Sequence, residues 1–351
     1  MKQFKRVIAL IIAVVMMVSF ASCSMIDETP VDITNDNIKI GVIIKDSRDT
    51  SSGDTGYAMA AINDVLGLGY GIGEERFTTI ESVNPDDEAA VSAALTEFIN
   101  KECNLVIATD NAYLDDIEKI AGGDNEDIKF FVLNAEDNGK NIYGYKADMT
   151  AAMYFTGLVA GMKAVALEMP KVGFVAANEE NIELLNAFAM GVKAASADAK
   201  VAVAYGADAA DKLIKDGCAV LASDYEDEAV AKAAADAKVF FCSFGSETYL
   251  NATNEETGEK LYESAFLCAP LYNYTQLYVN AIKAIVEEKE PETAFEGGYL
   301  EGIVYLSDLS EANVAEGTQE AVNAAVAAYA DGSLEIKVDA SAVLDNVNVI
   351  K

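Results

Sequence analysis

The feature that most constrains the fold is an alternation of short apolar runs with longer amphipathic segments, which begins at Ile38. The apolar runs predict strands at residues 39–45, 77–82, 105–108 and 129–134. The segments between them have helical periodicity, at residues 57–66, 86–101 and 112–121. Continuous apolar strands joined by helices are typical of a parallel sheet that is covered on both faces, so the sequence predicts an α/β fold.

The second half of the chain repeats this pattern. Three segments have counterparts in the same order, with residues 39–44, 103–110 and 129–134 corresponding to residues 171–176, 218–224 and 238–243. Asp110 and Asp224 end equivalent strands in this correspondence. Any protein built from strand–helix units shows some similarity of this kind, but three ordered pairs favour two similar, doubly wound parallel-sheet lobes.

Two such lobes predict where a ligand binds. In open α/β sheets, ligands bind beyond the carboxyl ends of the strands. Lobes that face each other place both sets of strand ends in one cleft, and rotation about a hinge then closes the cleft over its ligand.

The N-terminus has the pattern of an export signal. Lys2, Lys5 and Arg6 precede residues 7–20, which are apolar except for Ser19 and are fewer than the about 20 residues that a spanning helix needs. Residues 20–23, Phe-Ala-Ser-Cys, resemble the bacterial lipobox, in which the cysteine is acylated after cleavage. We therefore expect a signal peptide at residues 1–22, a lipid on Cys23 and a polar tether at residues 23–37. Secretion with ordinary cleavage nearby and an uncleaved membrane anchor are the alternatives.

Composition narrows the functions that remain. The chain has no histidine, which excludes Ser-His-Asp triads, Cys-His dyads and imidazole zinc sites. The net charge is −33, and it becomes −36 without residues 1–22, so nucleic acid is a poor partner. None of the cysteines has C-x-x-C spacing, and their apolar neighbours predict buried thiols. We expect no catalytic residue, no metal and no cofactor.

Several segments resemble the basic membrane protein (BMP) family of substrate-binding lipoproteins. They occur in the family's order over nearly the whole chain after the signal peptide, at residues 39–57, 151–164, 171–194, 278–289, 296–310 and 332–338. The resemblance implies a type I periplasmic-binding-protein fold and a role as the extracytoplasmic receptor of an ABC importer. Nucleosides are the ligand class best attested for the family.

The resemblance also implies that the chain crosses three times between the lobes, through a three-stranded hinge. We place the crossings near residues 146–148, 269–271 and 295–298. The first lobe then comprises residues 38–147 and 270–296, with a helix at 274–288. The second lobe comprises residues 148–269 and 297–351, with a helix at 311–330.

The loop after the first strand holds the first site candidates. The family has Asp-x-Ser-Phe-Asn there, with an aromatic ring that stacks on the base, and residues 54–58 match it as Asp-Thr-Gly-Tyr-Ala. The resemblance therefore points to Asp54 and Tyr57, and Asp46 precedes them in the same loop. Alternatively, Tyr57 only starts a helix and packs inward.

Three further candidates follow later strands. Asp110 could accept hydrogen bonds from ligand hydroxyl or amine groups, although aspartate at a strand end is often a helix cap. The family resemblance adds Phe188 and the preceding loop, in which Asn178 is a candidate donor. Core packing is the alternative for Phe188, because Gly191 follows it on the same predicted helix.

Two positions depart from the family pattern. Family members have acidic residues after a late strand, where this chain reads Cys-Ser-Phe-Gly-Ser at residues 242–246, and Tyr272 stands where the family has lysine. The acidic residues and the lysine that this chain lacks could be an acid–base pair in the family, so that the loss of one compensates the loss of the other. Phe244 and Tyr272 could both offer faces for a flat or sugar-like ligand, with core packing as the alternative.

The sequence thus predicts a lipid-anchored monomeric receptor on the outer face of a bacterial membrane. It would deliver a small ligand, a nucleoside or related compound, to an ABC permease by clamshell closure. A sensor partner, or a receptor for a sugar or amino acid, is the alternative function.

Overall fold

The computed structural model describes residues 38–50, 52–67, 72–138, 140–179, 181–254, 257–287, 289 and 295–350. The predicted signal peptide at residues 1–22, the predicted lipid site Cys23 and the tether up to residue 37 lie outside these residues. Within the described part of the chain, no helix is both long and apolar enough to cross a membrane.

The first lobe is built on a six-stranded parallel sheet. Its strands are β1 (Ile40–Ile43), β2 (Phe77–Ile80), β3 (Leu105–Ala108), β4 (Lys129–Leu133), β5 (Ile142–Ala147) and β11 (Phe295–Gly297). Its helices are α2 (Gly53–Gly67), α3 (Glu88–Asn100), α4 (Leu114–Ile120) and α9 (Thr275–Val286), with short 3₁₀ turns at η1 (Glu74–Arg76), η2 (Asn111–Tyr113) and η3 (Gly123–Asn125).

The second lobe is built on a five-stranded parallel sheet. Its strands are β6 (Lys171–Ala176), β7 (Lys200–Tyr205), β8 (Val220–Ser223), β9 (Phe240–Phe241) and β13 (Val347–Val349). Its helices are α5 (Thr150–Ala166), α6 (Ile182–Ala195), α7 (Ala209–Lys215), α8 (Glu228–Ala237) and α10 (Thr318–Ala330), and a 3₁₀ turn forms η4 (Thr248–Asn251).

The two sheets share one strand order. The first runs β2-β1-β3-β4 before β5 and β11, and the second runs β7-β6-β8-β9 after β13. Strands β1, β3 and β4 thus occupy the places of β6, β8 and β9, which are the pairs that the sequence repeat matched. The predicted α/β fold with two doubly wound parallel sheets is confirmed.

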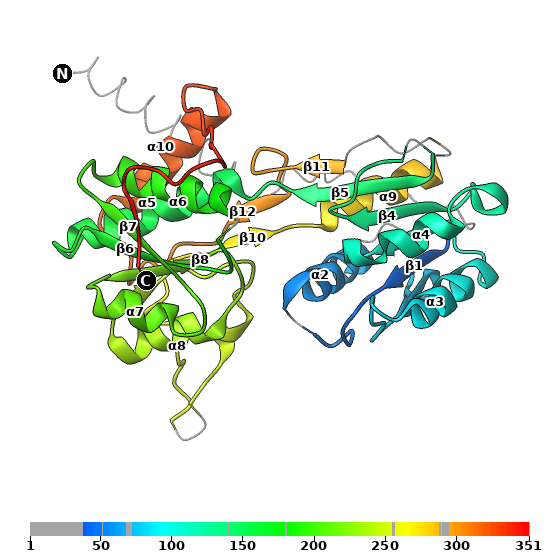
Figure 1. The fold of residues 1–351 in the computed structure, drawn as a ribbon, viewed down its shortest axis with the longest axis horizontal. Coiled ribbons are helices and arrows are strands. Elements are labelled where there is room, and N and C mark those ends of the chain that lie inside the picture. Colours follow the sequence, from blue (N-terminus) through cyan, green and yellow to red (C-terminus); the bar gives the residue numbers. More distant parts are fainter. Residues whose placement is uncertain are drawn as a thin grey trace, which may run out of the picture.

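Three stretches of chain join the lobes (Figure 1). They lead from β5 to α5, along β10 (Pro270–Tyr272), and from β11 through β12 (Val304–Leu306); β10 and β12 pair in antiparallel fashion. The third crossing follows β11 instead of coinciding with residues 295–298, because β11 pairs with β5 inside the first sheet. The exact lobe boundaries stay a prediction.

Two helices begin at other residues than the sequence predicts. Helix α2 starts at Gly53 rather than at residue 57, since its polar first turn carries no apolar periodicity. Helix α10 starts at Thr318 rather than at residue 311. The preceding Gly317 has a φ of +80°, a left-handed conformation that separates α10 from the turns before it.

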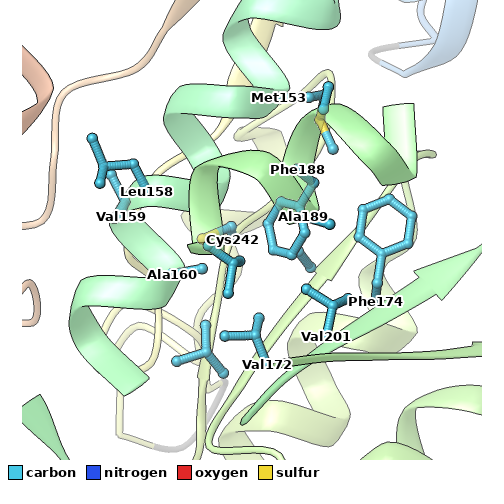
Figure 2. Packing of buried hydrophobic residues seen from close by; sticks show 14 of the residues in the cluster. Met153, Leu158, Val159, Ala160, Val172, Phe174, Phe188, Ala189, Val201 and Cys242 are labelled. Carbon is cyan, nitrogen blue, oxygen red and sulfur yellow. The ribbon is translucent and has the colours of Figure 1, made fainter. Parts of the chain in front are cut away.

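The core of the second lobe depends on a close crossing of α5 and α6. A Cβ atom at Gly157 would collide with the carbonyl oxygen of Phe188, and one at Gly191 would collide with that of Tyr154. The two backbones therefore approach closely and cover one face of the sheet, where the apolar side chains in Figure 2 pack.

Candidate ligand-binding cleft

Two hollows lie between the lobes and share the rings of Tyr57 and Tyr272. One has a volume of about 360 Å³, and we call it the cleft pocket. Its lining includes five of the eight predicted site residues, which are Asp46, Asp54, Tyr57, Phe244 and Tyr272. The other, of about 650 Å³, runs along α2 beside β10. A third hollow of about 290 Å³, beside α2 and α3 in the first lobe, holds none of the predicted residues.

The first lobe contributes the loop after β1 and the first turns of α2. Asp46 is tied to α2 because the Thr55 hydroxyl donates to its Oδ2 at 3.3 Å. Asp54 and Tyr57 stand in the first two turns of α2, so the start of the helix aims both side chains at the cleft pocket. These residues follow the carboxyl end of a parallel strand, where the predicted topology puts a ligand.

Asp110, at the end of β3, has two roles in the structure. Its Oδ1 accepts the Ala112 N–H at 3.0 Å and so caps η2, as the alternative interpretation expected. Its Oδ2 accepts a hydrogen bond from Lys45 Nζ at 2.9 Å, and Lys45 lines the cleft pocket. Asp110 therefore reaches the pocket through Lys45, and its direct contact with a ligand stays a prediction.

Asn178 lies in the exposed loop between β6 and α6. Its Oδ1 accepts the Asn181 N–H at 3.1 Å, which stabilises the turn into α6. Asn181 in turn donates from its side chain to Asp224, which lines the cleft pocket. The predicted role of Asn178 as a ligand donor stays a prediction.

The predicted ligand contact of Phe188 is wrong. Its side chain is fully buried, and its ring lies 5.1 Å from that of Phe174 in the core of the second lobe. Figure 2 shows it on α6, above the sheet residues Val172 and Val201. The core-packing alternative holds, because α6 turns this face toward α5 and the sheet.

An aromatic wall lines the pocket at the hinge. The ring centroids of Tyr57 and Tyr272 are 4.7 Å apart with the planes tilted by 44°, and Phe244 meets Tyr272 edge-on at 6.1 Å. Behind them the Tyr145 and Tyr278 hydroxyls share a hydrogen bond of 3.2 Å. Such a wall offers ring faces and phenol groups to the same ligand, although Phe244 is also part of the core.

Burial dominates the electrostatics of the pocket. It raises the pKa of the Asp54 carboxyl, an effect that the charge of Lys45 opposes. It likewise raises the pKa of Asp224, where hydrogen bonds from Ala177 and Asn181 act in the opposite direction. The hydrogen bond to Asp110 raises the pKa of Lys45. Carboxylates outnumber cations here, so the pocket is suited to a ligand rich in hydrogen-bond donors.

Several residues that line the cleft pocket were not among the predicted site residues, and Lys45, Tyr225 and Glu226 are the charged or aromatic ones that went unmentioned. Lys45 follows β1 directly, and the pair Tyr225 and Glu226 follows Asp224 beyond β8. Their positions after strand ends were a usable signal. Nothing local showed that Glu226 reaches the opposite lobe.

Cys103, Cys218, Cys242 and Cys268 are buried free thiols, as their apolar neighbours predicted. Across the part of the chain that the structure describes, no group of His, Cys, Asp or Glu side chains could hold a metal ion.

Comparison with known families decides the class of this fold. Residues 71–323 match the family described as ABC transporter substrate-binding protein, PnrA-like. The chain belongs to this family. The resemblance to the BMP family is thereby confirmed, and the family is one of transport receptors rather than enzymes. ABC transporter substrate-binding proteins act outside the cytoplasm, where they bind small molecules and deliver them to a permease.

One curated relative shares part of the sequence. A Haloferax volcanii protein named as an ABC transporter glucose-binding protein, TsgA13, is 25% identical over 239 residues. The match covers 65% of this chain and 57% of the relative, so this chain spans little more than half of the relative's length.

Solved structures share the fold at low sequence identity. A solute-binding protein of an ABC transporter system from Conexibacter woesei has a TM-score of 0.67 at 15% identity, over 86% of this chain and 99% of its own. A transcriptional activator of the comK gene from Bacillus halodurans also has a TM-score of 0.67, at 20% identity, over 84% of this chain and 99% of its own. The fold therefore serves more than transport, and the family match carries the functional assignment.

Proposed function

We propose that the protein is a lipid-anchored, monomeric receptor on the outer face of a bacterial membrane, which captures a nucleoside or related small ligand for an ABC permease. The observation that carries this is convergence: Asp54 and Tyr57 from the first lobe, Phe244 from the second and Tyr272 from the hinge line one pocket. Closure of the lobes over that pocket would bury the ligand between them.

The chemistry of the pocket supports a ligand that combines a flat face with hydroxyl groups. The Tyr57 and Tyr272 rings supply apolar faces, and the carboxylates of Asp54 and Asp224 accept hydrogen bonds. The loop after β9 lacks the acidic residues of the family, but Asp224 and Glu226 bring carboxylates from the neighbouring loop after β8. A ribose diol can therefore still find acceptors.

A sugar is the second candidate ligand. The relative that is named as glucose-binding supports it, and carboxylates beside aromatic rings suit sugar hydroxyls equally well. An amino acid is a weaker candidate, because its carboxylate would meet several acidic side chains. A sensor partner is the alternative to an importer, and permease and ATPase genes beside this gene would favour the importer.

A thermal-unfolding screen of the chain from residue 24 onward tests the proposal. Nucleosides, bases, sugars and amino acids are added separately, and a ligand at about 100 times its Kd should stabilise the fold by about 2.7 kcal/mol. Titration calorimetry then compares the wild type with Tyr57→Ala and Asp54→Asn. Asp115→Asn, an exposed aspartate in the first turn of α4, is the matched control.

Two results would contradict the proposal. If nucleosides leave the melting temperature unchanged and a sugar or amino acid raises it, the ligand class is wrong. If both cleft variants bind as tightly as Asp115→Asn, the site is wrong. Metabolic labelling with an alkyne fatty acid tests the anchor separately, since Cys23→Ala should abolish incorporation.

A further inference from the structure

Glu226 reaches across the cleft from the second lobe to the first. It lies between β8 and α8, and its Oε2 accepts the Gly53 N–H at 3.0 Å and the Tyr57 hydroxyl at 3.4 Å. The Glu226 carboxylate thus joins the two sides of the cleft.

The start of α2 is a favourable place for this carboxylate. Gly53 opens a helix of 15 residues, whose first N–H groups have no partner within the helix. The helix dipole adds a partial positive charge at the same end, and an acceptor that carries a full negative charge forms the stronger hydrogen bond there. From the second lobe, Glu226 therefore gives the start of α2 the negatively charged acceptor that an anionic ligand could otherwise provide.

Three neighbours hold Tyr57 in place, and Glu226 is one of them. Its ring lies against Tyr272, its hydroxyl donates to Glu226, and a Cβ atom at Gly245 of the second lobe would collide with that hydroxyl. Gly245 has a φ of +72°, so the close approach and the backbone conformation both require glycine. Burial, and then the charge of Glu226, raise the pKa of Tyr57, which keeps its hydroxyl a donor.

The other charged residues of the cleft pocket disfavour an anionic ligand. Lys45 is its cation, and it is engaged by Asp110 at 2.9 Å. Asp46, Asp54 and Asp224 add three carboxylates to that of Glu226. A phosphate or carboxylate group on a ligand would have to displace Glu226 from α2 and approach these charges.

We infer that Glu226 is both a latch and a specificity determinant: it holds the lobes together in the absence of ligand and rejects ligands that bring their own anionic group to α2. The second part rests on the proposed function and narrows its ligand class to uncharged or cationic compounds. The first part is independent of the ligand.

Distance measurement without ligand tests the latch. Spin labels on Ser92→Cys in α3 and Lys215→Cys in α7, in the chain from residue 24 onward, report the separation of the lobes. Both positions are exposed, and the four native thiols that the structure describes are buried. The Glu226→Ala variant should shift the distances to longer values, and Glu226→Gln, which keeps one acceptor oxygen, should shift them less. Glu228→Gln is the matched control, because Glu228 bonds Tyr262 within its own lobe. Identical distances in Glu226→Ala and the wild type would overturn the latch.

Calorimetry with matched probes tests specificity. The pairs are adenosine with adenosine 5′-monophosphate, and glucose with glucose 6-phosphate. The wild type should prefer the uncharged member of the pair it binds, and Glu226→Gln should narrow that preference by about two- to fivefold, while Glu228→Gln leaves it unchanged. An unaltered preference in Glu226→Gln would overturn the specificity role. If neither adenosine nor glucose binds, the proposed ligand class fails, and the distance measurement still decides the latch.

Discussion

Asp110 and Asp224 end equivalent strands of the two lobes, β3 and β8, yet different partners hold the two carboxylates. Asp110 faces the cation of Lys45 at 2.9 Å in a partly exposed pair. Asp224 is 6% exposed and accepts the Ala177 N–H at 2.8 Å and the Asn181 amide at 3.1 Å. One duplicated position has thus become an ion pair at the surface in one lobe and a buried acceptor of neutral donors in the other.

The contrast extends beyond these two residues. The first lobe meets the cleft with the start of α2 and a polar loop, where Asp54 makes no hydrogen bond to another described residue. In the second lobe, the side of the cleft is supported by helices α5 and α6, which pack closely against each other at Gly157 and Gly191. We interpret the first lobe as the adaptable side of the cleft and the second as the fixed side. Four substitutions test this interpretation.

The largest effect is expected from Phe188→Ala. Removing a fully buried ring beside Phe174 leaves a cavity, and the free energy of unfolding should fall by about 3–5 kcal/mol. Ligand affinity at a temperature where the variant is folded should be unchanged, whereas Phe244→Ala, at the cleft, should lose affinity. Denaturant unfolding and calorimetry measure the two quantities. Lost affinity in Phe188→Ala with unchanged stability would restore this residue to the site.

Asp224→Ala tests the fixed side directly. The substitution leaves the Ala177 N–H and the Asn181 amide without their acceptor, so the free energy of unfolding should fall by about 1–2 kcal/mol. Asp198→Ala, an exposed aspartate of the same lobe, is the control and should change little. Urea unfolding of both variants gives the comparison. Equal stability would show that water replaces the carboxylate without cost.

The sequence predicted most of the fold because the strand pattern is local. The run at residues 105–108 became β3 without a shift, and the order of β1, β3 and β4 reappeared in β6, β8 and β9. The start of α2 was missed because its first turn is polar and receives its acceptor from Glu226, which lies 173 residues away. Tertiary contacts of this kind leave no periodicity in the sequence.

The site was predictable only in part, for the same reason. Topology located the loop after the first strand, which holds Asp46, because strand ends of this fold meet at the cleft. The family resemblance then pointed to Asp54 and Tyr57 in that stretch. Phe188 was misassigned because an aromatic residue on a helix has the same pattern whether it faces a ligand or the core. Only the direction in which α6 turns distinguishes the two.

Asp54→Asn tests the adaptable side through pH. Burial raises the pKa of Asp54 in the folded protein, so the folded state binds the proton more tightly and the ionised carboxylate costs stability. The cost is absent below the ordinary pKa of 3.8 and fully present above the raised value. The variant should therefore be more stable than the wild type at pH 7 by about 1 kcal/mol or less, and the gain should shrink toward pH 4. A variant less stable than the wild type at pH 7 would show that Asp54 has a stabilising partner.

The smallest effect is expected from Asp110→Asn, which keeps an oxygen for the Ala112 N–H and removes only the charge that faces Lys45. Because the Lys45 side chain is 39% exposed, the loss in the free energy of unfolding should be about 0.5 kcal/mol at low salt. It should vanish near 1 M salt, where charges are screened over about 3 Å. The hydrogen bond to Asp110 raises the pKa of Lys45, so the contribution of the pair is present below its ordinary pKa of 10.5 and is lost as the pH rises past the raised value. Urea unfolding across salt and pH measures this. A loss as large as that of Asp224→Ala, and equally insensitive to salt, would remove the distinction between the two lobes.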